Sequence, residues 1–431
     1  MNKRLTPREA AVSLTKGNHH SMTWEEATDV LLDNFVISDK RKDDDGGQAD
    51  IRSRASNYTP LITDTFDPPK EQLETIIKHL KNGKGPGMDR LEAGILKAAW
   101  PAIGQLYHKL YVLYVACLAT GTFPGNWKRG RLHAILKPGN KDLTAPGFYR
   151  PICLLPLPAK ILESIILQKL TEHLDEVAAN SDLLKHQHGF IRGRSTTDAI
   201  IRLNKIVNEA THKYVVGIFV DIKGAFDHIW WPDILWSLRT CNTPVYIYNI
   251  IHHYLTNREV AIQDNLGLKT RQQERGCPQG SVLGPILWNL VFYSLLIELN
   301  NANLQTIGYA DDAVILISGN SRVALEDVGS SAISRVERWC SQHKMNLSAD
   351  KTVGLMLKGN FNKERRPRII IQGRAIKFHN GLDRSLLVKH LEFEDMHNSW
   401  LYCFTYPLEH IRLTMRKRNT CPKFKRISET I

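Results

Sequence analysis

The sequence predicts an α+β fold, and three features of its 431 residues carry that prediction. Residues 304–308 and 313–317 are short apolar runs separated by a polar turn, which is the pattern of a β-hairpin. Residues 214–220 are apolar on both faces, which indicates a buried central strand. Over residues 69–82 the apolar positions instead recur at the spacing of an amphipathic helix. Strands and helices are therefore mixed along the chain.

The other expected elements follow from the same two periodicities. Helices are expected over 91–120 (two helices), 158–177, after the loop that starts at 187, from about 229, over 244–255, and up to 299. Further strands are expected over 132–136, 151–155, 258–263 and 268–275. Residues 1–66 are polar, and the charged run at 40–48 is expected to be a solvated loop or linker.

Composition favours a polyanionic partner. Lys and Arg total 57 against 44 Asp and Glu, a formal charge of +13, which favours nucleic acid over a membrane surface. A basic protein without such a partner is the alternative. The seven cysteines are scattered without metal-binding spacing, so we expect reduced thiols and no structural zinc. Neither a signal peptide nor an apolar run of about 18 residues is found, so the sequence supports neither secretion nor membrane spanning.

Three acids form the first candidate site. Asp311 and Asp312 lie at the tip of the predicted hairpin, and Asp221 lies at the end of the predicted central strand. Buried carboxylates that repel one another require compensation, and a cation supplies it. Because Mg²⁺ prefers oxygen ligands, these three residues are candidate magnesium ligands. The alternative is a solvated Asp-Asp turn.

Two cations and an aromatic residue form a second candidate set. Lys137 and Arg150 lie at the two ends of the loop that joins the strands at 132–136 and 151–155, where they can converge on a triphosphate. An ordinary basic hairpin is the alternative. Phe226 follows Asp221 on the loop that is expected to leave the strand, and is either an apolar wall beside a substrate or a core residue.

Three other segments are each open to a functional or a structural interpretation. Gln279 and Gly280 lie where the chain enters the helix that ends at 299, and a helix N-terminus favours an anionic ligand; a structural corner is the alternative. Asp227 is expected to cap the helix that begins near residue 229. The glycine-rich stretch at 83–89 is expected to be a turn between helices rather than a phosphate loop.

Seven short motifs in a fixed order give a family resemblance. They are RLHAILKP (131–138), YRPICLLP (149–156), QHGFIRGRST (187–196), DIKGAFD (221–227), GCPQGSVLGP (276–285), YADD (309–312) and LSADKT (347–352). Together they resemble the motif series of reverse transcriptases encoded by non-LTR, LINE-type retrotransposons, jockey-like and type-1 elements in particular. The resemblance covers about residues 69 to 358.

The resemblance implies a right-hand polymerase fold. Fingers are expected over 69–213 as a helical region with a β-hairpin, and a palm over 214–358 with an antiparallel sheet flanked by helices. Residues 1–68 are expected to be a polar N-terminal extension, and 359–431 a degenerate basic segment with a faint motif echo at 388–400. A missing or incomplete thumb, and a truncated copy of an element, are expected on the same basis.

The resemblance also assigns roles. It implies that Asp221 and Asp311 bind two Mg²⁺ ions with Asp312 in support, and that Lys351 protonates the departing pyrophosphate. It implies a nucleotide site at the following positions: Lys137 and Arg150 on the triphosphate, Phe226 as a gate against the ribose 2′-hydroxyl, and Gln279 with Gly280 along the nucleotide pocket.

The implied function is RNA-directed DNA synthesis, by two-metal transfer of a nucleotide from a dNTP to a primer 3′-hydroxyl. The expected partners are an RNA template, a DNA primer or target, and dNTPs, with no membrane. The expected location is intracellular, in nucleus and cytoplasm as a ribonucleoprotein, and the sequence does not indicate an oligomeric state. The alternative is a catalytically inactive nucleic-acid-binding remnant or a domesticated domain.

Overall fold

The computed structural model of the chain describes residues 14–16, 19–21, 23–56, 68–102, 104–137, 143–361 and 365–379. Its α-helices are α2 (Trp24–Phe35), α3 (Gly46–Ser56), α4 (Lys70–His79), α5 (Ala93–Ala102), α6 (Gly104–Thr120), α7 (Leu157–Ala179), α8 (Thr196–Glu209), α9 (Ala225–His228), α10 (Trp231–Thr240), α11 (Val245–Leu255), α12 (Gly284–Asn301) and α13 (Arg322–Gln342). In the described part of the chain no helix is both long and apolar enough to cross a membrane.

The strands form two main sheets and two short pairs. Those of the main sheets are β3 (Arg129–Leu136), β4 (Tyr149–Leu154), β5 (Tyr214–Lys223), β6 (Arg258–Gln263), β7 (Leu268–Gln273), β8 (Gln305–Tyr309), β9 (Asp312–Gly319), β10 (Asn346–Leu347), β11 (Val353–Lys358) and β14 (Lys377–His379). The short pairs are β1 (Thr15–Lys16) with β2 (His19–His20), and β12 (Ile370–Ile371) with β13 (Arg374–Ala375).

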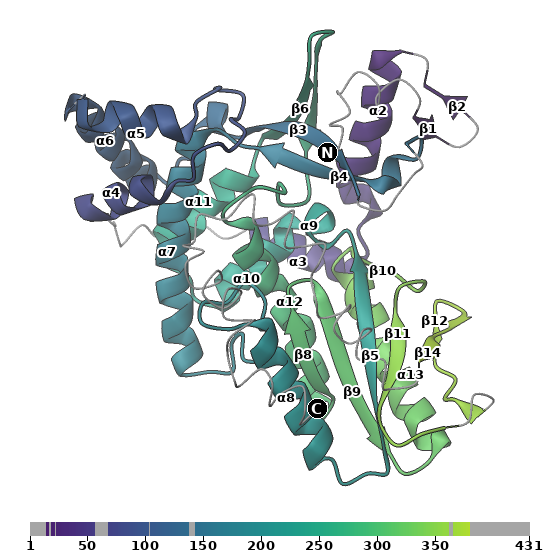
Figure 1. Cartoon of the computed structure of the whole chain (residues 1–431). Helices are drawn as coiled ribbons and strands as arrows, with labels where there is room; N and C mark the ends of the chain where they lie inside the picture. The colour runs from purple at the N-terminus through teal and green to yellow at the C-terminus, as the bar shows by residue number, and fades with distance from the viewer. Residues whose placement is uncertain are drawn as a thin grey trace, which may run out of the picture.

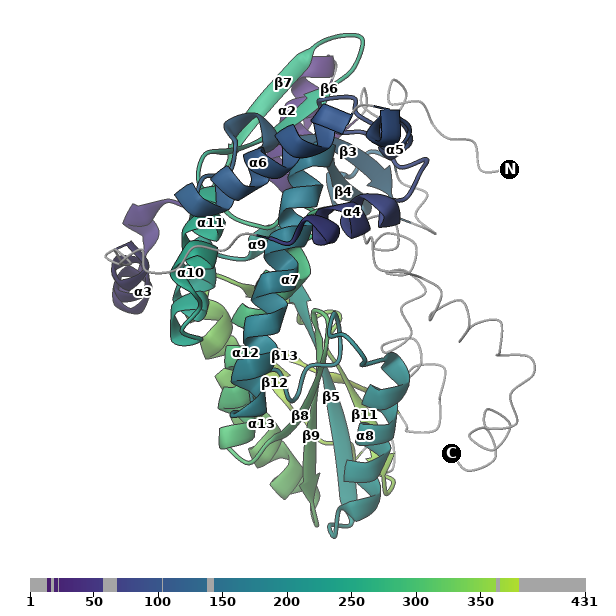
Figure 2. The same cartoon turned by 90° about the vertical axis from the view of Figure 1, so that its left-hand side faces the viewer.

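The larger sheet is built around β5. Its strand order is β14-β11-β5-β9-β8, and β10 also pairs with β5 (Figure 1). Alternate residues of β5 enter different cores: Val215 and Phe219 pack with α8, whereas Val216 and Ile218 join the core that contains α12 and α13. Figure 2 shows α8 on one side of this sheet and α12 and α13 on the other. The sheet is covered on both faces, as expected for the apolar run at 214–220.

The smaller sheet lies at the other end of the molecule (Figure 1). Its order is β4-β3-β6-β7, with β3 and β4 antiparallel and β3 and β6 parallel. Helices α4, α5 and α6 lie near this end, and the long helix α7 runs from it toward the larger sheet (Figures 1 and 2). The observed architecture is therefore a mixed α+β fold of two sheets with flanking helices, and the α+β prediction is confirmed.

Most local expectations are confirmed. The two helices within 91–120, the helix at 158–177, the strands at 258–263 and the hairpin of β8 and β9 all form, each within a few residues of its expected bounds. The loop at 83–89 is a turn that connects the helices α4 and α5. It packs closely on the rest of the protein, because a Cβ at Gly87 would lie 2.5 Å from the Pro156 backbone nitrogen. The expected segments at 388–400 and 401–431 lie outside the described residues.

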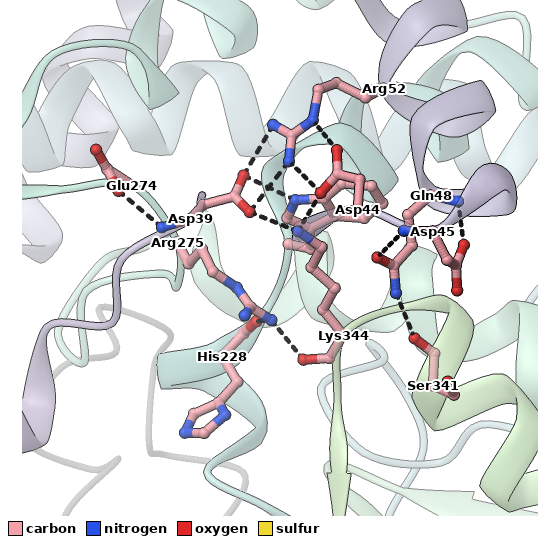
Figure 3. Close-up of polar contacts among 11 residues, drawn as sticks. Asp39, Asp44, Asp45, Gln48, Arg52, His228, Glu274, Arg275, Ser341 and Lys344 are labelled. Carbon is pink, nitrogen blue, oxygen red and sulfur yellow. Dashed lines mark hydrogen bonds and ion pairs between the residues drawn. The ribbon is translucent and has the colours of Figure 1, made fainter. Parts of the chain in front are cut away.

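The expectation of a solvated loop or linker at 40–48 is right only in part: most of these residues are exposed, but Asp44 and Gln48 are not, and parts of the run are helical. The run begins beside a short helical turn (η1, Arg41–Asp43) and continues into α3, which packs on α10. The side chains of Asp39 and Asp44 are only 7% and 3% exposed, and both accept bonds from Arg52 and Lys344 (Figure 3). Local charge density suggested solvation, but the partner Lys344 is 300 residues away in sequence and could not be identified from that run.

Candidate functional site

A tight hairpin turn carries two of the three predicted acids. Tyr309 and Asp312 are direct partners in the β8–β9 ladder, so the turn consists of Ala310 and Asp311. Ala310 has φ +57°, a left-handed conformation that is unusual for a residue with a Cβ. A positive φ at the first turn residue is typical of a tight two-residue hairpin turn, where glycine is the usual residue.

The third acid meets this hairpin across the sheet. Asp221 of β5 is the direct antiparallel partner of Asp312 of β9, which places their side chains on the same face, with Cβ atoms about 5 Å apart. The Oδ2 atom of Asp221 is buried and has no hydrogen-bond partner among the described residues. Asp221, which is far from Asp311 and Asp312 in sequence, is thus their neighbour in the sheet, as the sequence predicted.

The acids disfavour one another's ionisation. Burial first, and then the charge of Asp221, raises the pKa of Asp311 to about 6. Burial also raises the pKa of Asp312 well above its ordinary value, and the charges of Asp311 and Asp221 add to this rise. Both shifts oppose the ionised form at neutral pH. A positive charge placed between these carboxylates would remove the conflict.

Lys351 is a basic side chain in contact with the acids. Its Nζ lies 3.6 Å from Oδ1 of Asp221, and 71% of the side chain is exposed. The loop that carries it is tied to β5, because the Ser348 backbone N–H donates to the Asp221 carbonyl and the Asp221 N–H donates to Thr352 Oγ1. Lys351 therefore lies beside one of the three acids, and its role as a proton donor stays a prediction.

The donor set suits a hard divalent cation. The three carboxylates supply the oxygen ligands that Mg²⁺ prefers, and one of their oxygens, Asp221 Oδ2, is buried without a hydrogen-bond partner among the described residues. Across the described ranges, however, no three His, Cys, Asp or Glu side chains already form a finished metal cluster. Mutual repulsion of the carboxylates, and the attraction of Asp221 to Lys351, both oppose close convergence. The backbone therefore brings the three acids together as predicted, but their side chains do not converge closely enough to form a metal site.

The two predicted triphosphate cations lie at the end of the β3–β4 hairpin. Lys137 directly follows β3, and its Nζ donates to the Gly147 carbonyl at 2.8 Å. Arg150 lies on β4 opposite Ile135. Burial, and then the charges of Lys351 and Arg150, lower the pKa of Lys137, while Asp227 and Asp221 act in the opposite direction. Lys137 therefore shares an electrostatic environment with the acid site and with its own predicted partner.

Phe226 is a buried residue on a helix rather than on a loop. It belongs to the short helix α9 and is packed edge-on against Phe190 at 5.9 Å and beside Trp288 at 5.7 Å between ring centroids. The left-handed Gly224 (φ +59°) makes the turn from β5 into this helix. The Phe226 ring is therefore held rigidly in place. This rigidity fits both of the predicted roles, that of a core residue and that of a gate.

Gln279 is joined to Asp227, and the expected capping role of Asp227 is wrong. The Nε2 atom of Gln279 lies 3.1 Å from each carboxylate oxygen of Asp227, and no side chain caps α10. Burial raises the pKa of Asp227 to about 7. Helix α9 begins at Ala225, about four residues before the expected start near residue 229, so Asp227 lies inside α9 rather than in front of a helix. The Gln279 carbonyl also accepts the Cys153 N–H of β4, which links the loop before α12 to the smaller sheet.

Gly280 does not stand at an open helix N-terminus. Helix α12 starts at Gly284, and the N–H groups of Val282 and Leu283 donate to Oε2 of the fully buried Glu163. A side-chain carboxylate thus occupies the position expected for an anionic ligand. Gly280 has φ +129° and serves as a loop residue, which is the structural alternative for this corner.

Two residues that hold the turn in place are not among the site residues predicted from the sequence. The carbonyl of Ala310 accepts hydrogen bonds from Gln187 Nε2 at 3.0 Å and from Trp288 Nε1 at 2.9 Å, and all three residues are buried. Gln187 opens the motif at 187–196, but its partner is 123 residues away. No local sequence pattern predicts the hydrogen bond between Gln187 and Ala310. The only signal in the sequence is that Gln187 belongs to the motif at 187–196.

Comparisons with known proteins agree with this arrangement. The sequence profile described as reverse transcriptase (RNA-dependent DNA polymerase) matches residues 135–381, more than half of the chain. The chain is 32% identical, over 82% of its length, to a protein named putative 115 kDa protein in type-1 retrotransposable element R1DM of Drosophila melanogaster, of which it covers 32%. It is 31% identical, over 83% of its length, to the Pol polyprotein from type-1 retrotransposable element R1 of Bradysia coprophila, of which it covers 34%.

A third relative is the RNA-directed DNA polymerase from mobile element jockey of Drosophila melanogaster, at 27% identity over 73% of the chain and 35% of that protein. The chain thus spans about one third of the length of these relatives. The matched segment contains the acid hairpin, β5, the Gln279 loop and Arg150. On this evidence, the chain belongs to the reverse transcriptase family, among the relatives encoded by R1-type and jockey-type non-LTR retrotransposons.

Proposed function

We propose that this chain is the RNA-directed DNA polymerase of a LINE-type retrotransposon. The observation that carries the proposal is the pairing of Asp221 with Asp312 in adjacent strands, with Asp311 on the turn beside them. Family membership supports the reaction class. The expected substrates are dNTPs, and the expected partners are an RNA template and a DNA primer, whose backbones suit a basic protein.

The proposed architecture is that of a right hand. The larger sheet with α8, α12 and α13 corresponds to the palm at 214–358, with α8 added from the preceding segment. The smaller sheet with α4, α5 and α6 corresponds to the fingers at 69–213, although β6 and β7 come from within the expected palm segment. The fingers and palm are thus interwoven in sequence, and a thumb is not assigned among the described residues.

The proposed chemistry follows from the acids. Two Mg²⁺ ions bound between Asp221, Asp311 and Asp312 would supply the charge that lowers the pKa of the primer 3′-hydroxyl and neutralises the triphosphate. The protein holds these carboxylates on adjacent strands of a sheet covered on both faces, which limits their motion. Lys351, exposed beside Asp221, is placed to give a proton to the departing pyrophosphate.

The proposed nucleotide site lies between the two sheets. Lys137 and Arg150 would hold the triphosphate, and Gln279 with Gly280 would line the pocket beside the base and sugar. Phe226, fixed by Phe190 and Trp288, would exclude a ribose 2′-hydroxyl. Phe226→Val should therefore raise the use of rNTPs relative to dNTPs in primer extension by about 10-fold, and an unchanged ratio would refute the gate.

Primer extension tests the proposal. Purified chain is given a DNA primer on an RNA template with dNTPs and Mg²⁺, beside the Asp311→Asn variant. The matched control is Asp182→Asn, which changes an exposed acid paired with Lys185 in the loop after α7. We expect extension by the wild type and the control and none by Asp311→Asn. Extension no greater than that of Asp311→Asn would instead favour the inactive nucleic-acid-binding remnant.

A further inference from the structure

The turn that presents Asp311 is held in an unfavourable backbone conformation. Ala310 is fully buried with φ +57°, a region that L-residues other than glycine, Asn and Asp rarely occupy. Left to itself, the peptide between Ala310 and Asp311 would relax to a more common turn. Because Asp311 directly follows Ala310, such a relaxation would redirect the Asp311 side chain. Some external contact must therefore hold the turn in place.

A two-donor clamp supplies that contact. Gln187 Nε2 and Trp288 Nε1 both donate to the Ala310 carbonyl, at 3.0 and 2.9 Å. Gln187 comes from the loop before α8 and Trp288 from α12, so the carbonyl is held from two independent elements. Both of its lone pairs are used. Reorientation of this peptide would leave two buried donors without an acceptor, which is strongly unfavourable.

The loop that carries Gln187 is itself rigidly seated. Gly308 exchanges backbone hydrogen bonds with it, donating to the His186 carbonyl and accepting from the His188 N–H. A Cβ at Gly189 would lie 2.0 Å from the Ala310 nitrogen, so only glycine allows this approach. Gln187 Oε1 accepts the Gly189 N–H at 2.9 Å. The Gln187 amide is thus oriented at both ends: its oxygen faces a donor and its nitrogen faces an acceptor.

We propose that Gln187 is a positioning residue for Asp311: by clamping the Ala310 carbonyl together with Trp288, it fixes the direction in which the Asp311 carboxylate enters the acid site. This inference rests on the proposed function, because it concerns the use of Asp311 as a metal ligand. It adds a residue that touches neither substrate nor metal. Its effect is transmitted through one peptide group.

The chain offers a matched control for this test. Gln48 is also a buried glutamine, its Nε2 donates to the Ser341 carbonyl at 2.8 Å, and its Oε1 accepts a backbone N–H from Asp45 (Figure 3). Gln187→Met and Gln48→Met therefore remove the same type of amide clamp from two places. General loss of stability affects both variants. Only Gln187→Met should affect the acid site.

The kinetic test measures primer extension as a function of Mg²⁺ and dNTP concentrations. For Gln187→Met we expect kcat to fall about 10- to 100-fold and the half-saturating Mg²⁺ concentration to rise about 10-fold. The KM for dNTP should stay within about twofold, because the nucleotide contacts are unchanged. Gln48→Met should leave all three parameters near those of the wild type. Equal Mg²⁺ requirements in the two variants would overturn the proposal.

A rescue experiment separates positioning from folding. Ala310→Gly removes the backbone penalty that the clamp opposes. In the Gln187→Met background it should lower the half-saturating Mg²⁺ concentration back toward the wild-type value. A double variant with the same Mg²⁺ requirement as Gln187→Met would contradict the proposed role.

A third readout does not depend on catalysis. The Trp288 indole N–H, assigned in NMR spectra with Trp288→Phe, should exchange with solvent faster in Gln187→Met than in the wild type or Gln48→Met, because the turn opens more often. If the wild type extends no primer, the proposed function fails and this exchange rate alone judges the clamp. An exchange rate equal to that of Gln48→Met overturns the clamp even in an active enzyme.

Discussion

Two pairs of buried acids in this protein have opposite electrostatic surroundings. Asp39 and Asp44 join the N-terminal segment to the body of the protein, and Asp311 and Asp312 sit on the hairpin turn. Burial acts to raise the pKa of Asp39, but hydrogen bonds from Arg52, Lys344 and Trp230 outweigh it, so the pKa is lowered. The bond from Arg52 lowers the pKa of Asp44 to about 2. The hairpin acids show the reverse shift.

The difference separates acids that hold the fold together from acids that we propose take part in the chemistry. In the first pair each carboxylate has two cationic partners within the protein, Arg52 and Lys344 (Figure 3). Arg52 Cζ and Lys344 Nζ both also lie 5.0 Å from the Trp230 ring centroid. In the second pair the nearest charges are other carboxylates, apart from the exposed Lys351. An uncompensated cluster of like charges costs stability and marks a candidate functional site.

The largest expected effect concerns Asp221, which faces the hairpin. Asp221→Asn should reduce primer extension about 1,000-fold, since a lost metal ligand removes several kcal/mol of transition-state stabilisation. The free energy of unfolding should not fall, because the substitution removes a repulsive charge from the cluster. Extension assays and urea denaturation measure the two quantities. A large loss of stability would show that Asp221 belongs with the structural acids instead.

The next effect concerns Lys344 in the structural cluster. Lys344→Met leaves Asp39 and Asp44 with a single cation, and removing one partner of a buried ion pair costs about 3 kcal/mol. Urea denaturation should show a loss of that order. The control is Lys205→Met, which removes an exposed pair with Glu209 and should change the unfolding free energy by less than about 0.5 kcal/mol. Equal losses in the two variants would argue against the buried network.

A pH series should distinguish the two clusters further. Because the pKa of folded Asp44 is about 2, below its ordinary value, its contribution is complete above about pH 4 and is lost as pH falls toward 2. The wild type should therefore lose stability more steeply than Asp44→Asn over that range, as measured by urea midpoints. Parallel curves for the two proteins would contradict the assignment of Asp44 as a structural acid.

The smallest expected effect on the free energy of unfolding is at Lys351. Because its side chain is 71% exposed and lies 3.6 Å from Asp221, Lys351→Met should change the unfolding free energy by less than about 0.5 kcal/mol. Primer extension should still fall, by about 100-fold if Lys351 supplies the proton to pyrophosphate. Unchanged extension would remove Lys351 from the mechanism without affecting the comparison between the acids.

The sequence predicted what depends on local pattern. Strand β5 and the β8–β9 hairpin follow from short apolar runs, and the capping box of Ser195 and Asp198 at the start of α8 likewise involves residues close together in sequence. The order of the motifs, through the family resemblance, then predicted that Asp221 and Asp311 lie in one site. These features need only neighbours in sequence or a known series of motifs.

What could not be predicted depends on partners far away in the chain. The Gln187 clamp, the Asp227–Gln279 bond and the ion pairs of Lys344 join residues separated by 52 to 305 positions. The charged run at 40–48 is predicted to be a solvated loop or linker because charged runs are usually solvated, and Asp227 is predicted to be a cap because acids often precede helices. At Asp44 and at Asp227, tertiary contacts outweigh this local preference.

The effect of Mg²⁺ on unfolding tests the central claim most directly. Because the pKa of folded Asp311 is raised to about 6, its ionised form opposes folding at pH 8. Without Mg²⁺, Asp311→Asn should therefore be more stable than the wild type. With Mg²⁺ at about ten times its dissociation constant, the wild type should gain about 1.4 kcal/mol and the variant none. An equal gain in both proteins, or no gain in either, would contradict the account.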